Sequence, residues 1–89
     1  MKMSIAAIAQ WMLDEINLSQ ILEQDRAAGE IHDRFGSEFT YDNDYGNLSI
    51  RRDVLIAFRK LSEETVVWDR SERLWRLREP HDEPGRQQY

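Results

Sequence analysis

Apolar residues recur every three or four positions along three stretches of the chain, the spacing that places them on one face of a helix. The first stretch covers residues 4–16, and Ser4 at its start can accept a backbone hydrogen bond as an N-cap. The second covers residues 20–35, and Gly36 after it is a common residue at a helix end. The third covers about residues 48–61, so the pattern predicts three helices. The positions expected to face the core are Ile5, Ile8, Ala9, Met12 and Ile16, then Ile21, Leu22, Ala28, Ile31 and Phe35, then Ile50, Val54, Ala57, Phe58 and Leu61.

The segments between these helices break the helical spacing. Residues 17–19, Asn-Leu-Ser, separate the first two helices and can hold a strand of two or three residues. Residues 37–48 are rich in Asp, Asn and Gly, which favour turns, and their aromatic residues alternate with polar ones as in an extended segment. Asn47 or Ser49 is expected to cap the third helix.

The pattern changes again after the third helix, where β-branched and aromatic residues predominate. Residues 65–69 and residues 74–78 have the composition of two strands, joined by the short connection 70–73. Pairing across this connection places Trp68 opposite Trp75, an aromatic pair that stabilises a hairpin. The sequence therefore predicts an α+β fold, with three helices followed by a short antiparallel hairpin.

Length and composition bound the organisation of the chain. Its 89 residues suffice for one domain, expected over residues 1–78, and residues 79–89 hold two prolines and a glycine, which is typical of a flexible arm. The start of the chain lacks the apolar segment of a signal peptide, and no apolar run approaches the roughly 18 residues of a membrane span. Together with the absence of cysteine, this predicts a cytoplasmic protein without a membrane partner.

Positive charge is concentrated in the second half of an acidic chain. Residues 49–78 carry eight Lys and Arg against five Asp and Glu, whereas residues 1–48 carry three against nine. The net charge is −5, which argues against sequence-independent coating of nucleic acid because such domains are basic as a whole. Only a local basic face can act on an anionic partner.

Little in the sequence indicates catalysis. It contains no G-x-S-x-G, P-loop or G-x-G-x-x-G motif. Glu63 and Glu64 are adjacent and point in different directions, so they do not form an acid–base pair. His32 and His81 lie far apart and have no cysteine to join them in a zinc site. We therefore expect no enzyme, no cofactor, no metal site and no small-molecule substrate.

Residues 42–47 have the composition of a calcium loop but not its spacing. A loop with Gly46 at the sixth position would place Tyr41 at the first position and Arg52 at the twelfth, where carboxylates are required. A turn that leads into a helix cap accounts for the same residues.

Several segments of the chain follow one another in a recognisable order. They are IAQWML, GEIHDRFG, YDNDYGNLSIRRDVLIAFRKL and VVWDRSERLWRLR. The combination resembles a family of small uncharacterised bacterial proteins, some encoded on mobile (integron-type) gene cassettes, for which no chemistry is assigned. The order of helix, short strand, helix, helix and hairpin, over about residues 4–78, resembles a winged helix-turn-helix domain.

The winged-helix resemblance implies a set of nucleic-acid-binding residues. In winged helices that bind DNA, the third helix enters the major groove and the hairpin touches the backbone or the minor groove. By position, Arg51, Arg52 and Lys60 would then face the groove, and Arg70 and Arg73 would belong to the wing. The acidic total and the very short hairpin depart from this pattern.

Each basic cluster also has an alternative explanation. Arg51 and Arg52 oppose the dipole at the start of the third helix, which suggests contact with phosphate or bases, but ion pairs with Glu38, Asp42 or Asp44 would also account for them. The arginines beside the two tryptophans can bind single strands by stacking, yet packing under cation–π covers is the favoured interpretation.

The sequence favours a non-enzymatic binding module that contacts a protein partner or a second copy of itself. A small core makes self-association a stabilising option, and Met3, Trp11 and Met12 near the start of the chain are the expected contact surface. The alternative is a transcriptional regulator that binds duplex DNA through the third helix and the basic hairpin.

Overall fold

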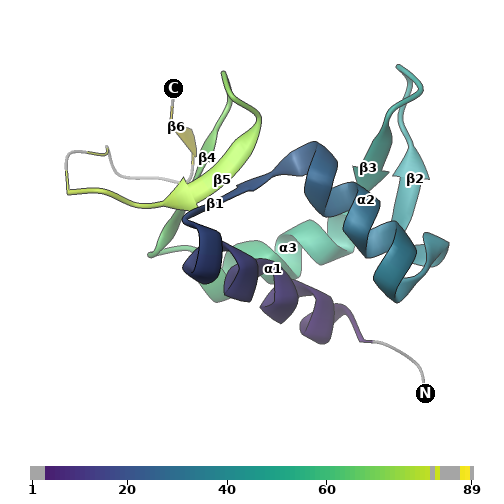
Figure 1. The fold of residues 1–89 in the computed structure, drawn as a ribbon, viewed down its shortest axis with the longest axis horizontal. Helices are drawn as coiled ribbons and strands as arrows, with labels where there is room; N and C mark the ends of the chain where they lie inside the picture. The colour runs from purple at the N-terminus through teal and green to yellow at the C-terminus, as the bar shows by residue number, and fades with distance from the viewer. Residues whose placement is uncertain (1–3, 81, 83–86, 89) are drawn as a thin grey trace.

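A computed structural model describes residues 4–80, 82, 87 and 88. Its elements are α1 (Ile5–Ser19), β1 (Ile21–Glu23), α2 (Gln24–Phe35), the 3-10 turn η1 (Ser37–Phe39), β2 (Thr40–Asp42), β3 (Leu48–Ile50), α3 (Arg52–Ser62), β4 (Val66–Asp69), β5 (Leu74–Leu77) and β6 (Gln87–Gln88). The expected α+β class is confirmed, with three helices and two small sheets in the described part of the chain (Figure 1).

The larger sheet joins distant parts of the chain. Its strand order is β1-β5-β4-β6, and β5 pairs antiparallel with both β1 and β4. Trp68 lies opposite Trp75 across the β4–β5 hairpin, as the sequence predicts. The strand β6 adds to the outer edge of β4 in parallel, so part of the expected arm 79–89 belongs to this sheet.

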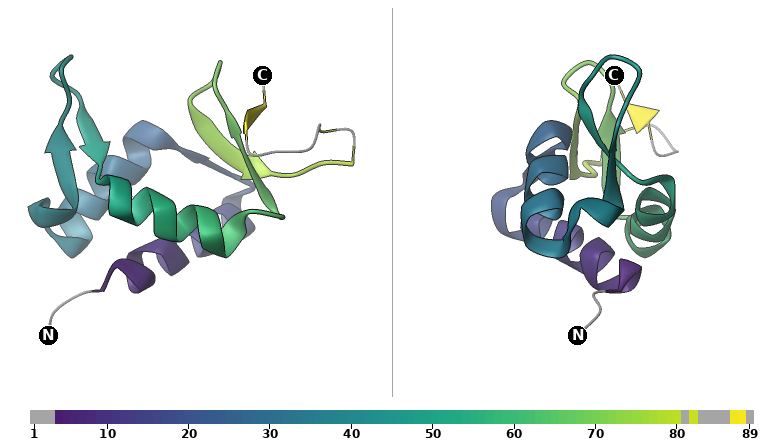
Figure 2. Two further views of the ribbon diagram at one scale, coloured as in Figure 1. Left: turned by 180° about the vertical axis from the view of Figure 1, so that it is seen from behind. Right: turned by 90° about the vertical axis from the view of Figure 1, so that its right-hand side faces the viewer.

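The helices form the body beneath the sheets. α1 packs against α3, on the side of the molecule away from the hairpin tips, and α2 and α3 lie on opposite sides of the body (Figure 2). The core brings together apolar side chains from α1, α2, α3, β1, β3, β4 and β5. Its fully buried members include Ile8, Met12, Ile16, Leu22, Ile31, Ile50, Val54, Phe58 and Val66.

Two hairpins project in the same direction from this body. The hairpin β4–β5 belongs to the larger sheet, whereas β2 and β3 pair only with each other. Both tips point away from α1 in each of the three views (Figures 1 and 2). The β2–β3 hairpin thus stands beside the N-terminus of α3, and the β4–β5 hairpin follows its C-terminus.

The first helix is longer than its apolar spacing predicts. Ser4 caps it as expected, accepting a hydrogen bond from the Ala7 N–H at 3.1 Å. The helix continues through the segment expected to be a strand and ends at Gln20, which adopts a left-handed conformation and donates its N–H to the Ile16 carbonyl. The short strand therefore follows at Ile21–Glu23, within the segment assigned to the second helix.

The third helix begins four residues later than predicted. Leu48–Ile50 forms β3 instead, and the cap position belongs to Arg51, whose side chain makes no capping bond. Ile50 is buried as expected, but from a strand. Its spacing to Val54 is that of a helix, so a short strand that runs directly into a helix extends the helical pattern. Leu61, assigned to the core, is exposed.

None of the helices in the described residues is both long and apolar enough to cross a membrane.

Candidate interaction surface

The outer face of α3 carries cations around an apolar centre. Arg52, Ile56, Arg59 and Lys60 recur at the spacing of one helix face, opposite the buried Val54 and Phe58. The Ile56 side chain is 44% exposed. Within the described residues, the side chains of Arg52, Arg59 and Lys60 form neither a hydrogen bond nor an ion pair. We call these four residues the α3 outer face.

The cations of α2 show the opposite behaviour. Arg26 pairs with Glu15 at 3.5 Å and with Glu30 at 3.1 Å, and Arg34 pairs with Glu30 at 3.2 Å. Arg34 also lies 5.8 Å from the centre of the Trp11 ring. The cations of α2 are therefore paired with carboxylates of the same chain, whereas those of the α3 outer face are not paired within the described residues.

Arg51 differs from its neighbour Arg52. Its guanidinium donates to the Glu38 carbonyl at 2.8 Å and to the Asp53 carboxylate at 2.8 Å. The side chain therefore fastens the start of α3 to the segment before β2. Arg51 does form an ion pair, but with Asp53 in the first turn of α3, so the suggested pairing with the carboxylates of Glu38, Asp42 or Asp44 was wrong.

The turn between β4 and β5 is organised by Asp69. One oxygen of its carboxylate accepts from the Ser71 hydroxyl at 2.8 Å, the Ser71 N–H at 3.0 Å and the Glu72 N–H at 3.1 Å. The Ser71 hydroxyl and then the Glu72 N–H lower the pKa of Asp69, because they stabilise its ionised form. The exposed Arg70 lies in this turn.

Arg73 ends the same turn in a conformation that arginine rarely adopts. Its φ of 54° falls in the left-handed region, which costs a residue with a Cβ about 1–2 kcal/mol. Its guanidinium contacts Gln24 at 3.3 Å and lies 3.9 Å from the Asp25 carboxylate. The two wing candidates therefore occupy one turn, with Arg73 leaning toward the start of α2.

The other cations and the tryptophans of the hairpin stabilise the fold. Arg76 donates both guanidinium nitrogens to Asp82 at 2.8 Å, and the Asp82 side chain is only 4% exposed. This bidentate pair raises the pKa of Arg76. Trp75 is buried, with its ring centre 5.4 Å from that of Phe58 and 4.9 Å from that of Trp68. The expectation that the tryptophans pack, instead of stacking on bases, is confirmed for Trp75.

The contact surface expected near the start of the chain does not form as predicted. Met12 is fully buried, so its assignment to a contact surface was wrong. Its position in the apolar spacing of α1 places its side chain on the core face of the helix. Trp11 is half-buried, its ring edge-on to Phe35 with 5.8 Å between centres. Met3 lies outside the described residues.

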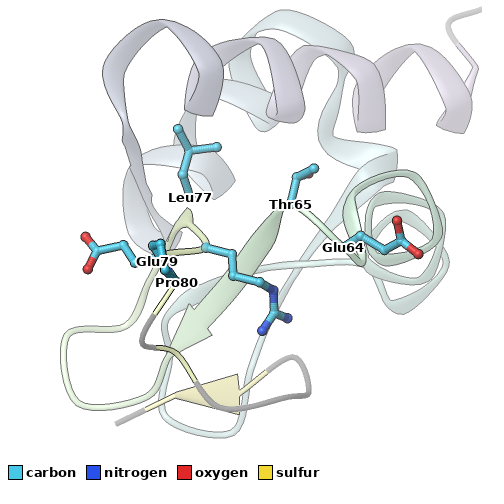
Figure 3. A pocket seen from close by; sticks show the side chains of 6 residues that line it. Glu64, Thr65, Leu77, Glu79 and Pro80 are labelled. Atoms are coloured by element: carbon cyan, nitrogen blue, oxygen red, sulfur yellow. The ribbon is translucent and has the colours of Figure 1, made fainter.

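A hollow lies beside the end of β5. It holds about 420 Å³ and opens to solvent, and its lining residues are Glu64, Thr65, Leu77, Arg78, Glu79 and Pro80. Figure 3 shows the carboxylates of Glu64 and Glu79 pointing away from each other to either side of it. Over the described part of the chain, no group of three or more His, Cys, Asp or Glu side chains is placed to hold a metal ion.

The sequence found part of the α3 outer face. Arg52 and Lys60 were named by position from the winged-helix resemblance, and the structure brings them to one face of α3, whereas Arg51 is engaged elsewhere. Arg59 and Ile56 were missed as site residues. Counting helical positions from Arg52 would have found both, since they follow it by seven and four residues.

The comparison with known proteins identifies one family. Its model, described as a family of unknown function (DUF6953), matches residues 4–77. No curated protein and no solved structure matches the chain.

Proposed function

The chain belongs to the DUF6953 family, whose function is unknown, and from its own residues we propose that it is a non-enzymatic binding module on a winged-helix scaffold that holds duplex DNA against the α3 outer face. One observation carries the proposal: Arg52, Arg59 and Lys60 share a face of α3 and have no partner within the described residues. Cations kept free of internal ion pairs are suited to an external anion.

The connectivity supports the winged-helix scaffold. The order α1, β1, α2, α3, β4 and β5 has the short first strand and the terminal hairpin in the places that the resemblance implies, and β1 joins that hairpin in one sheet. The β2–β3 hairpin between α2 and α3 is an insertion relative to that order. After this insertion, the order α3, β4 and β5 is the same as in a winged helix.

The α3 outer face suits the chemistry of a DNA groove. Arginine and lysine neutralise phosphates and release counterions, and arginine also donates in a bidentate manner to guanine. Ile56 lies between the cations, where an apolar side chain can contact a thymine methyl group. Arg70 and Arg73 in the β4–β5 turn supply backbone contacts in the manner of a wing.

The net charge of −5 does not oppose this proposal, because the acidic residues are unevenly placed. The carboxylates of α2 belong to a helix on the opposite side of the body from α3 (Figure 2). Asp53, the acidic residue in the first turn of α3, is paired with Arg51. The α3 outer face is therefore separated from the carboxylates of α2, although the β2–β3 hairpin beside the start of α3 carries Asp42 and Asp44.

Protein interaction is the second candidate, and one observation favours it. Tyr41 and Tyr45 on the β2–β3 hairpin are exposed, Tyr45 to 89% of its surface. Tyrosine is enriched at the centres of protein interfaces, and about half of Tyr41 and most of Tyr45 face solvent.

Fluorescence anisotropy of a labelled mixed-sequence duplex, titrated at low and at physiological salt, tests the proposal. We expect a dissociation constant of about 1–100 µM that rises steeply with salt. The triple substitution of Arg52, Arg59 and Lys60 by glutamine should abolish binding and leave the melting temperature unchanged. Absence of binding at low salt, or unchanged binding by the triple variant, would refute the proposal.

A matched pair of variants locates the site. Arg59→Gln and Arg34→Gln each remove one positive charge, but only the first lies on the α3 outer face. Arg59→Gln should weaken binding and reduce the slope of log K against log salt by about 1, and Arg34→Gln should do neither. Arg51→Ala is a poor probe, since it also removes two hydrogen bonds that hold the start of α3.

A further inference from the structure

The turn of the β2–β3 hairpin is closed by hydrogen bonds of its own, and the hairpin exposes carboxylates and tyrosines. The Asn43 side-chain oxygen accepts from the Tyr45 N–H at 2.9 Å and the Asn47 N–H at 3.0 Å, and its amide donates to Ser49 at 3.1 Å. Gly46 supplies the left-handed φ of 78° that the turn requires. The tip is therefore held in one shape by its own hydrogen bonds.

Four side chains of this hairpin, two carboxylates and two tyrosines, are exposed to solvent. Asp42 and Asp44 are exposed and make no ion pair within the described residues. Tyr41 and Tyr45 are exposed as well. Ile50 at the base of the hairpin is buried in the core, so the packing of the hairpin does not depend on its tip.

The same chain carries a surface of opposite charge. The α3 outer face holds three cations without internal partners around a half-exposed isoleucine, and the hairpin tip holds two carboxylates without partners between two tyrosines. Within one chain the two surfaces form no ion pair, although β3 leads directly into α3. Complementary charge beside exposed aromatic and aliphatic side chains is the composition of a protein interface.

We propose that two copies of this chain form a two-fold dimer in which the β2–β3 hairpin of each copy docks on the α3 outer face of the other. A two-fold arrangement uses both surfaces of both copies and then closes, so no further copy can add. Asp42 and Asp44 of one copy then lie beside Arg59 and Lys60 of the other, where the proposed function places DNA phosphates. The dimer would cover the proposed DNA-binding face, so self-association and DNA binding would exclude each other. This regulatory consequence rests on the proposed function.

Exchange of charges between the two surfaces tests the dimer without DNA. One variant carries Asp42→Lys and Asp44→Lys, and the other carries Arg59→Glu and Lys60→Glu. In either variant alone, like charges face each other across both contacts of the dimer. In an equimolar mixture, both contacts of the mixed pair join opposite charges again.

Sedimentation equilibrium gives the outcome. We expect the wild-type chain to form dimers, each variant alone to dissociate at least about tenfold more readily, and the mixture to recover the wild-type behaviour. Recovery in the mixture also shows that both variants are folded. A monomeric wild-type chain, variants that still associate alone, a mixture that stays monomeric, or assemblies that grow beyond two copies would each overturn the proposal.

A second arm separates this proposal from the DNA proposal. Asp42→Asn with Asp44→Asn should weaken the dimer and tighten DNA binding measured at protein concentrations where the wild type is dimeric. If no variant binds DNA but the exchange of charges behaves as expected, the DNA proposal fails and the dimer stands. If DNA binding is unchanged by the asparagine variant while the dimer weakens, the two surfaces do not compete, and the regulatory part of the proposal is wrong.

Discussion

The two hairpins of this molecule point in the same direction and differ in how they are attached to the rest of the fold (Figure 1). The β4–β5 hairpin is central to a four-stranded sheet and buries Trp75 against Phe58. The β2–β3 hairpin pairs with no other strand and exposes both of its tyrosines. The first hairpin therefore lies within the main sheet and the core, whereas the second contributes to the core only near its base, through Leu48 and Ile50.

The turns of the two hairpins use the same device with different chemistry. In the β4–β5 hairpin the carboxylate of Asp69 accepts backbone N–H groups from residues two and three positions later. In the β2–β3 hairpin the amide oxygen of Asn43 accepts those two and four positions later. A charged acceptor responds to pH and a neutral one does not, so the two turns differ in how the environment can loosen them.

The largest expected difference between the hairpins concerns their aromatic residues. Trp75→Ala should lower the free energy of unfolding by about 3–5 kcal/mol, because it leaves a cavity beside Phe58 and Trp68. Tyr45→Ala should change it by less than about 0.5 kcal/mol, since the side chain is exposed. Urea unfolding followed by circular dichroism measures both. Similar losses from the two variants would show that the β2–β3 hairpin also supports the core.

A smaller effect with opposite signs is expected from the left-handed residues of the two turns. Gly46→Ala should cost about 1 kcal/mol, because alanine is strained at a φ of 78° although no atom lies within 4 Å of its Cβ. Arg73→Gly should raise the stability by up to about 1 kcal/mol, because it relieves strain at a φ of 54°. Thermal unfolding gives both values, with Gly29→Ala in α2 as a control that should be stabilising. A loss of stability in Arg73→Gly would mean that its contacts with Gln24 and Asp25 outweigh the strain.

The smallest effect is a pH dependence confined to one hairpin. The folded pKa of Asp69 is lowered, so the stability that its carboxylate contributes is fully present above the unfolded pKa of about 3.9 and is lost as the pH falls through the folded pKa. Acidification should therefore loosen the amides of Ser71 and Glu72 and leave those of Tyr45 and Asn47 in place. NMR titration of these amides checks the prediction, and Asp69→Asn should remove the response. Equal loosening of both turns would point to global acid unfolding instead.

The comparison also separates what periodicity can predict from what it cannot. The β4–β5 hairpin was predicted with its Trp68–Trp75 register, because β-branched and aromatic residues are concentrated in it. The β2–β3 hairpin was missed, because its strands have three residues each and Ile50 continues the helical spacing of α3. Short strands leave too few alternations to outweigh a helical pattern next to them.

The residues of the candidate site also differ in whether the sequence could identify them. The winged-helix resemblance supplied Arg52 and Lys60 by their position in the third helix, but it could not tell Arg52 from Arg51, because the partners of Arg51 depend on where η1 and α3 meet. Asp82 was assigned to a flexible arm, and neither its ion pair with Arg76 nor its hydrogen bonds with Glu79 were anticipated. Side chains that act through a distant partner are therefore found only in the folded molecule.

The pairing of β1 with β5 constrains the order in which this protein can fold. Ile21 lies opposite Arg76, so the sheet cannot close until nearly the whole domain has left the ribosome. Closing so long a loop costs entropy before any strand pairing compensates for it, which slows folding compared with helical proteins of this size. The β2–β3 hairpin needs only residues 40–50 and can form early. Leu22, the central residue of β1, therefore lacks its partner strand until β5 has been made, whereas both strands of the smaller sheet are present once residue 50 has been added.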